Sequence, residues 1–396
     1  MTELSYDPRA PEVHEDPYPF YQRLRDEAPV LHIEDKEKDF FVVSRFDDIF
    51  RSVRTPKVFS SASGLTFEDD EIAKIGVPPT IVMMDAPQHT AFRRLIARGF
   101  TPKHITRLEE GIRAFVVDRV ERLKRGEDTD LITSLAGPTP TQSLAMLMDI
   151  PESDYRHFDG WSNAIVQANA DGSGIIHGAA IAVAQLFEYF TSLIAKRRAD
   201  PGDDLITALA HAEVDNTRLT DFEIVGFCFV MIAGGNDTST GLIGGAVELL
   251  QQYPEQQAML REDPSLMPKA IEEFLRMTSP VQGLCRTTLE PVNIAGTNIE
   301  AGKKVMFLYG SGNRDEREFG DNAHELDIQR EVPRHLSFTS GPHFCLGAAL
   351  ARMQGSIAIG ELLTRIPSFN VDLDEAQLAP GYFVRRYERM PFEVRS

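Results

Sequence analysis

The longest hydrophobic pattern in the chain predicts a helix that crosses the interior. It begins at Thr220, because Thr220 and Glu223 have the spacing of a capping box. It continues to about Leu250, just before a Tyr-Pro pair, which makes it about 31 residues or ~45 Å long. Residues 224–246 are apolar or small on every face except at 236–240, as in a buried helix. A membrane span is the alternative, but the central aspartate and the lack of a second such segment disfavour it.

Elsewhere the pattern predicts further helices and a few short strands. The clearest helical patterns cover 105–123, 179–198 and 267–277, and a helical pattern also follows at 348–366. Strand-like runs cover 40–43, 292–299 and 305–309, and clusters of Pro and Gly predict loops at 77–80 and 136–140. No linker, low-complexity tract or fixed repeat divides the sequence. We therefore expect one domain, residues 1–396, that is mainly α with a minor β part.

Charge and cysteine content narrow the class of protein. The 41 Lys and Arg against 60 Asp and Glu give a net charge of −19, which disfavours nucleic acid or an anionic membrane as the main partner. The three cysteines are few and far apart, so a disulfide framework is not expected. Residues 1–19 are polar, without the pattern of a secretion signal or membrane anchor. A soluble, cytoplasmic protein is predicted.

Cys345 lies in a segment with a distinctive pattern of small and aromatic residues, Phe-Thr-Ser-Gly-Pro-His-Phe-Cys-Leu-Gly, at 338–347. A single cysteine beside a helix is most often an inert buried residue. Here, however, it precedes a predicted helix, whose free N–H groups stabilise a thiolate and lower its pKa. Gly341 and Gly347 allow the backbone to pass close to a flat cofactor. The thiolate is a candidate nucleophile or metal ligand, and the absence of a nearby second cysteine disfavours zinc and iron–sulfur sites.

The polar interruption of the long helix is the second candidate site. Polar groups inside a buried helix cost free energy unless they are satisfied or functional. Gly234 and Gly235 leave room beside the helix, Asp237 offers a titratable carboxylate, and the Thr238 hydroxyl can bond back to the carbonyl four residues earlier. A close helix–helix contact built on small residues is the alternative. A phosphate loop is disfavoured, since no strand precedes these glycines and no lysine follows them.

Together these segments resemble the cytochrome P450 family. The haem-binding loop of that family has the form Phe-x-x-Gly-x-His/Arg-x-Cys-x-Gly, and residues 338–347 match every fixed position. Thr339 departs from the glycine that bacterial members usually carry. Residues 234–239 are similar to the family's oxygen-binding segment, Ala/Gly-Gly-x-Asp/Glu-Thr-Thr/Ser. The resemblance extends over nearly the whole chain and implies the P450 fold, with the long central helix over the haem.

The resemblance implies a role for several residues. The cofactor would be haem b, iron protoporphyrin IX, with Cys345 as the axial ligand to iron. The haem propionates would contact four side chains: His89, Arg93, Arg286 and His343. Asp237 and Thr238 would deliver protons during catalysis. Glu273, Arg276 and Arg330 resemble the family's structural ion-pair group beneath the haem, whereas Cys228 and Cys285 have no comparable setting.

The implied reaction is the hydroxylation of a substrate by O2 with two electrons and two protons. In soluble bacterial members the electrons come from NAD(P)H through a ferredoxin reductase and a ferredoxin. Residues 86–108 contain five basic and no acidic residues, so this segment is a candidate docking surface for an acidic ferredoxin; a solvated cationic face is the alternative. A monomer is expected. A peroxide-driven peroxygenase is the nearest rival, disfavoured because such enzymes replace the Asp-Thr pair. A haem-binding sensor without turnover would not need that pair.

The substrate is predicted only as a class. Positions expected to line the pocket are mainly apolar: Met83, Met84, Val230, Ala233, Val281, Gln282, Leu284 and Phe383. A largely apolar pocket with one amide favours a medium-sized hydrophobic molecule such as a terpenoid, a steroid or a lipid.

Overall fold

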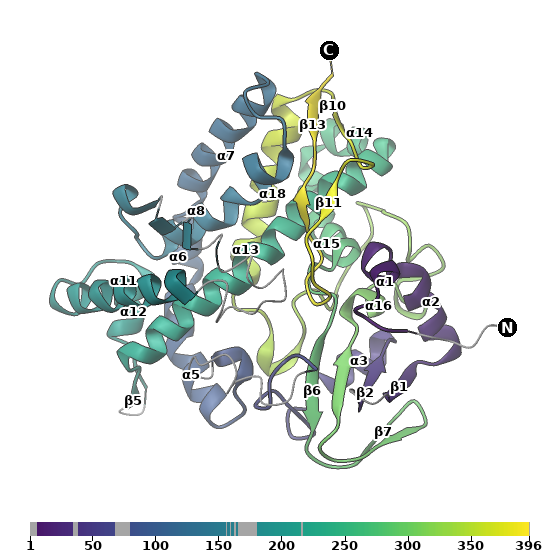
Figure 1. Ribbon diagram of the computed structural model, residues 1–396. Coiled ribbons are helices and arrows are strands. Elements are labelled where there is room, and N and C mark those ends of the chain that lie inside the picture. The colour runs from purple at the N-terminus through teal and green to yellow at the C-terminus, as the bar shows by residue number, and fades with distance from the viewer. Residues whose placement is uncertain are drawn as a thin grey trace.

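A computed structural model describes residues 6–34, 39–67, 80–155, 157–158, 160–161, 164, 180–214 and 217–395. The predicted loop at 77–80 lies outside the described residues except for Thr80. Helices form most of the molecule, and a five-stranded sheet with small hairpins forms the rest (Figure 1). The mainly α prediction is confirmed.

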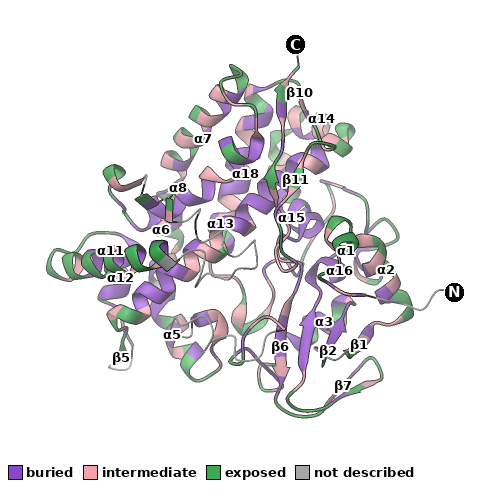
Figure 2. Cartoon of the chain, in the orientation of Figure 1, coloured by how far each residue is buried: buried purple, intermediate pink, exposed green. Residues whose placement is uncertain are grey.

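The predicted long helix is α13, Asp221–Gln252, and it crosses the middle of the molecule (Figure 1). Its capping box is formed: Glu223 N–H donates to the Thr220 hydroxyl, and the Glu223 carboxylate accepts from Thr220 N–H at 2.8 Å. Most of its residues are buried (Figure 2). Since an apolar surface on every face needs cover from every side, α13 is packed by helices that come from distant parts of the chain.

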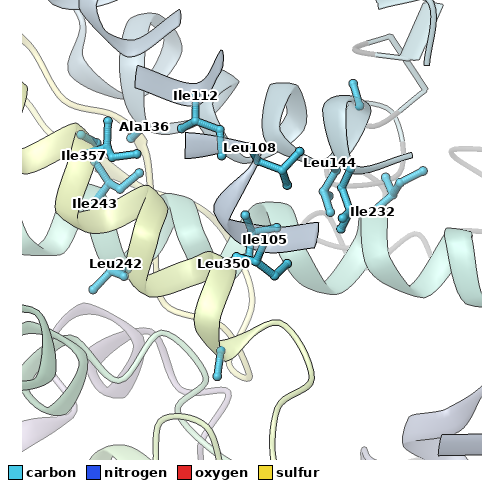
Figure 3. Close-up of a cluster of buried hydrophobic side chains, with 14 of the residues drawn as sticks. Ile105, Leu108, Ile112, Ala136, Leu144, Ile232, Leu242, Ile243, Leu350 and Ile357 are labelled. Carbon is cyan, nitrogen blue, oxygen red and sulfur yellow. The ribbon is translucent and has the colours of Figure 1, made fainter. Parts of the chain in front are cut away.

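The main core lies where α13 packs against α18 (Ala348–Arg365) and α8 (Pro138–Leu147), and where α7 (Glu109–Lys124) packs in turn against α18 and α8. Ile105, Ile112, Leu144, Ile243 and Ile357 meet there (Figure 3). Each is 4% exposed or less, and full burial of such a side chain contributes about 1.5–3 kcal/mol. This packing holds α13 against the helix that begins just after Cys345.

The other helices surround this centre. Those before and around α13 are α1 (Pro11–Glu15), α2 (Tyr18–Glu27), α3 (Phe46–Ser52), α5 (Gln88–Ile96), α6 (Pro102–Thr106), α11 (Ala180–Ala199) and α12 (Leu205–Ala210). Those after it are α14 (Pro254–Glu262), α15 (Met267–Thr278), α16 (Tyr309–Gly312) and α17 (Glu316–Phe319). A membrane-spanning helix is not found in the part of the chain that the structure describes.

The main sheet has the order β1-β2-β9-β6-β3. Its strands are β1 (Val30–Glu34), β2 (Asp39–Val43), β3 (Phe59–Ser60), β6 (Leu284–Thr288) and β9 (Lys304–Phe307). β2 pairs in parallel with β9, and β6 pairs antiparallel to β9 with Arg286 opposite Val305. The smaller pairs are β4 (Glu213–Val214) with β5 (Thr217–Arg218), β7 with β8, β10 (Phe369–Val371) with β13 (Phe392–Val394), and β11 (Gln377–Leu378) with β12 (Tyr387–Arg389).

Several predicted boundaries were wrong for local reasons. The expected loop at 136–140 is helical, because a π-helical turn at Ile132–Ala136 leads directly into α8, and Pro138 occupies the first turn, where proline is tolerated. The helix expected over 105–123 is divided into α6 and α7. The strand expected over 292–299 is a hairpin, β7 (Val292–Ile294) and β8 (Thr297–Ile299). It turns at two residues with positive φ, Ala295 and Gly296.

Candidate functional site

Cys345 lies in a tight loop between a 3₁₀ turn, Gly341–His343, and the first residue of α18. Its N–H donates to the Phe338 carbonyl at 3.0 Å. Gly341 has φ +73°, and a Cβ there would lie 3.0 Å from the Arg54 backbone, so only glycine fits. Thr339 has φ +53°, which explains why glycine is usual at this position in the family that the sequence resembles.

Burial raises the pKa of the Cys345 thiol, while the Gly347 N–H and the nearby Arg93 and Arg352 lower it to a smaller extent. The net direction is opposite to the prediction from sequence, which considered the helix N-terminus and omitted desolvation. Coordination to a metal deprotonates a thiol outright. Cys345 therefore fits a metal ligand better than a free nucleophile.

Four donor side chains gather beside this loop, as the sequence predicted. His89 and His343 have ring centroids 4.1 Å apart, and Arg93 donates to the Phe344 carbonyl at 2.6 Å. Burial first, and then Arg286, His89 and Arg93, lower the pKa of His343 to about 3. Burial and Arg93 also lower the pKa of His89. Two guanidinium groups and two imidazoles are thus crowded together where burial disfavours further positive charge.

The two arginines of this group lack acidic partners within the described residues, whereas Asp85 acts on His89. Neither Arg93 nor Arg286 has a carboxylate at ion-pair distance there, and the buried Nε2 of His89 has no hydrogen-bond partner. Arg93 and Arg286 donate to backbone carbonyls, and His343 lies 3.3 Å from the Ser61 hydroxyl. A buried polar atom without a partner, such as His89 Nε2, is rare unless a ligand satisfies it. A flat molecule with two carboxylates fits these donors, and its ring would lie next to Cys345. The residues present therefore fit haem.

The α13 segment supplies an acid and a hydroxyl. The Thr238 hydroxyl donates to the Gly234 carbonyl at 2.7 Å, as predicted. A Cβ at Gly234 would meet nothing within 4 Å, whereas one at Gly235 would lie 3.3 Å from Leu144. Gly234 thus leaves open space, and Gly235 serves the contact between α13 and α8. The room expected beside both glycines is therefore found at Gly234, and the expectation was wrong for Gly235.

Asp237 is 8% exposed and pairs with Arg386, whose Nε lies 2.6 Å from its carboxylate. Burial raises the pKa of Asp237, and Arg386 opposes that rise. No local sequence pattern indicates this partner, because Arg386 comes from the C-terminal segment. A Cβ at Gly241 would lie 2.7 Å from the Arg385 carbonyl, so this glycine allows the segment to reach α13.

The predicted pocket residues divide into two groups. Met83, Val230, Ala233, Val281, Leu284 and Phe383 are half-buried, while Met84 belongs to the main core. The Gln282 amide donates to the carbonyls of Thr278 and Ser279 and accepts from the Tyr21 hydroxyl. Gln282 therefore has a structural role, and its amide is not free for a substrate.

The predicted ion-pair group is formed in the core. Glu273 and Arg276 are both fully buried, and the Arg276 Nε lies 2.7 Å from the Glu273 carboxylate. The Arg330 Nε lies 3.1 Å from the same carboxylate. Arg276 also donates to the carbonyls of Asn313 and Ala323. This network ties α15 to the segment that leads to the Cys345 loop.

The chain and its fold are similar to known proteins. Residues 175–379 match the family model described as Cytochrome P450. The chain is 45% identical to cytochrome P450 130 of Mycobacterium tuberculosis over 387 residues, which cover 96% of this chain and 95% of that one. The structure of the polyketide biosynthesis cytochrome P450 PksS of Bacillus subtilis matches with a TM-score of 0.90 and 30% identity, over 99% and 100% of the chains. CYP109E1 of Bacillus megaterium in complex with testosterone matches with a TM-score of 0.86 and 30% identity, over 96% and 100%.

The chain belongs to the cytochrome P450 family. It is a P450 monooxygenase, and its cofactor is haem. Its reaction uses O2, a small-molecule substrate and a redox partner.

Proposed function

We propose that this P450 hydroxylates a medium-sized hydrophobic molecule, with electrons that pass from NAD(P)H through a ferredoxin reductase and a ferredoxin. In this proposal Cys345 holds the haem iron, and His89, Arg93, Arg286 and His343 hold the propionates. The observation that carries the assignment is the gathering of these four donors beside the Cys345 loop, where His89 Nε2 has no hydrogen-bond partner among the described residues. Bound haem with a thiolate ligand supplies oxygen activation, because the sulfur donates electron density that favours O–O cleavage.

Thr238 and Asp237 are proposed to position a water molecule and to deliver protons. The Thr238 hydroxyl is fixed by Gly234, so its oxygen can hold a water molecule in the open space beside that glycine. Asp237 is the nearest carboxylate on the same helix, and its raised pKa suits a group that takes up and releases protons. This pair disfavours a peroxide-driven enzyme, because such enzymes replace it, and a sensor, because a protein without turnover needs no proton delivery.

The substrate class rests on the half-buried apolar residues and on the relatives. A P450 of Bacillus megaterium has been solved with testosterone and with corticosterone, and one of Mycobacterium marinum with pseudoionone. These ligands belong to the steroid and terpenoid classes. We propose the same classes, or a lipid, for this chain. With Gln282 engaged, shape and apolar contact determine selectivity.

We also propose that residues 1–396 act as one domain and as a cytoplasmic monomer. The core and the donor group support a single domain, because both combine residues from the first hundred positions with residues after position 340. Sedimentation of the holoprotein tests the monomer.

The test of the ligand assignment is the spectrum of the reduced carbon monoxide complex. The parent protein is expected to show the red-shifted Soret band of thiolate ligation, and Cys345→Ala to lose it. Cys228→Ala and Cys285→Ala are matched controls that remove the other two thiols, both buried. Retention of the band by Cys345→Ala would overturn the assignment. Product formed with ferredoxin, reductase and NAD(P)H, but not with peroxide alone, separates the proposal from both rivals.

A further inference from the structure

A polar cavity lies next to Arg386, the residue that pairs with Asp237. Its volume is about 330 Å³, and it is bounded by α13, by the α1–α2 connection and by the C-terminal segment around β12. Such a volume holds on the order of ten water molecules. The exposed residues Glu15, Asp16, Gln252 and His324 stand at its mouth. None of the residues proposed to bind haem or substrate lines it.

One face of α13 connects this cavity to the active site. Gly241, Gly245 and Glu248 line the cavity and follow Asp237 at intervals of four, four and three residues, so all four share one face of the helix. Asp237 and Glu248 are about 16 Å apart along the axis. The two glycines leave this face without side chains. The cavity reaches this face at Gly241 and Gly245, while the Arg385 carbonyl covers part of Gly241 and the Thr278 side chain part of Gly245.

The walls of the cavity carry charge that water must solvate. Glu248 accepts from the Tyr387 hydroxyl and from Gln252, and it faces Arg385 and Arg314. Burial raises the pKa of Glu248. Arg314 is 9% exposed, and its buried Nε has no partner among the described residues. Polar groups of this kind hold ordered water and keep a cavity hydrated.

Arg386 joins the two sites. It lines the cavity, and its Nε lies 2.6 Å from the Asp237 carboxylate. Asp237 itself does not line the cavity. A rotation of the long Arg386 side chain away from α13 would open Asp237 to the cavity water. Because arginine stays protonated, Arg386 can hold or release the carboxylate but cannot carry the proton.

We propose that this cavity is the entry through which protons from solvent reach Asp237, and that Arg386 is the positioning residue that controls access to it. A cavity water gives its proton to an Asp237 carboxylate oxygen, and solvent at the mouth, or Glu248, returns a proton to that water. This inference rests on the proposed function, since it needs Asp237 as the proton donor of the active site.

The first test measures the ion pair without turnover. An infrared pH titration of the substrate-free holoprotein follows the carboxylic acid band that Asp237→Asn removes. Arg386→Met should move that band's titration to higher pH by about one unit or more, and Arg386→Lys should restore it in part. Arg197→Met is the control, because it breaks another part-buried arginine–aspartate pair, Arg197–Asp204, at 2.9 Å. An Asp237 titration that is unchanged in Arg386→Met would overturn the role of Arg386.

The second test measures proton entry during turnover. Glu248→Met replaces the carboxylate with an apolar side chain of similar length and should dry the cavity, whereas Glu248→Gln keeps it polar. Glu248→Met is expected to slow product formation roughly tenfold and to raise the solvent deuterium isotope effect, with unchanged substrate affinity and carbon monoxide spectrum. Glu248→Gln should lie between it and the parent.

The Asp237 and Glu248 variants together separate the role of the cavity from the role of Asp237. If Asp237→Asn slows turnover while Glu248→Met leaves both rate and isotope effect at the parent values, protons enter elsewhere and only the cavity's role is lost. If Asp237→Asn itself turns over like the parent, the proposed role of Asp237 is wrong.

Discussion

Thr339 occupies a backbone conformation that suits glycine. Its φ of +53° costs a β-branched residue about 1–2 kcal/mol, and its buried hydroxyl has no partner among the described residues. Part of the gain from glycine is offset by the greater freedom of the unfolded chain. Thr339→Gly is therefore expected to stabilise the holoprotein by about 1 kcal/mol, read as a higher urea midpoint.

The neighbouring Ser340 provides the control for this substitution. Its φ of −150° is extended backbone, so Ser340→Gly should destabilise the protein by about 0.5–1 kcal/mol. If both variants lose stability equally, the positive φ at Thr339 is not a source of strain.

Thr238 and Asp237 should fail in different ways when they are replaced. Thr238→Ala is expected to keep haem, substrate affinity and NAD(P)H consumption while product per NAD(P)H falls several-fold and hydrogen peroxide takes its place, because the hydroxyl that holds the proton-donating water is gone. Asp237→Asn should slow oxygen consumption itself, by about 100-fold, because shape remains and proton supply is lost.

Measurement of product, peroxide and NAD(P)H in the same reaction tests the difference. Thr240→Ala is the matched control, since it removes a hydroxyl from the same helix whose partner is the Ala136 carbonyl. Product that remains tightly coupled to NAD(P)H in Thr238→Ala would exclude this pair from proton delivery.

At the scale of elements, the sequence predicted those features of a helix that depend on its own residues, such as where it begins and which faces are apolar. The capping box placed the start of α13 at the correct residue, and an apolar surface on all sides predicted its central position. Breaks that depend on tertiary packing were not predictable. Nothing in 105–123 marks the division between α6 and α7, and the proline at 138 reads equally well as a loop or as the first turn of a helix.

The site residues also divide into those that a local sequence pattern indicates and those that only the tertiary fold brings together. Cys345, His89 and Arg93 lie in compact patterns, and the structure brings them together beside Arg286 and His343. Arg386 meets Asp237 only because the C-terminal segment folds back over Gly241, and no local pattern records that return. The sign of the pKa change at Cys345 also depends on burial, which a sequence motif does not contain.

At the scale of the whole molecule, a net charge of −19 would repel an acidic electron carrier. The segment 86–108 is the local exception. Arg94 and Lys103 are exposed in it, while Arg107 pairs with Asp203 at 2.7 Å. Phe344, 41% exposed, lies next to Cys345 and is tied to Arg93. Electrons that enter here would have a short path to Cys345, the proposed thiolate ligand.

The positive charge of segment 86–108 should therefore attract an acidic ferredoxin to this face, although the rest of the protein is negatively charged. Arg94→Glu combined with Lys103→Glu is expected to slow reduction by ferredoxin about tenfold at low salt, with substrate binding unchanged, and the difference from the parent should shrink as salt screens the charges. Lys124→Glu, an exposed residue at the end of α7, makes the same kind of charge reversal away from this segment and should have little effect. Equal slowing by Lys124→Glu would mean that only the total charge matters, and parental reduction kinetics in the double variant at low salt would place the docking surface elsewhere.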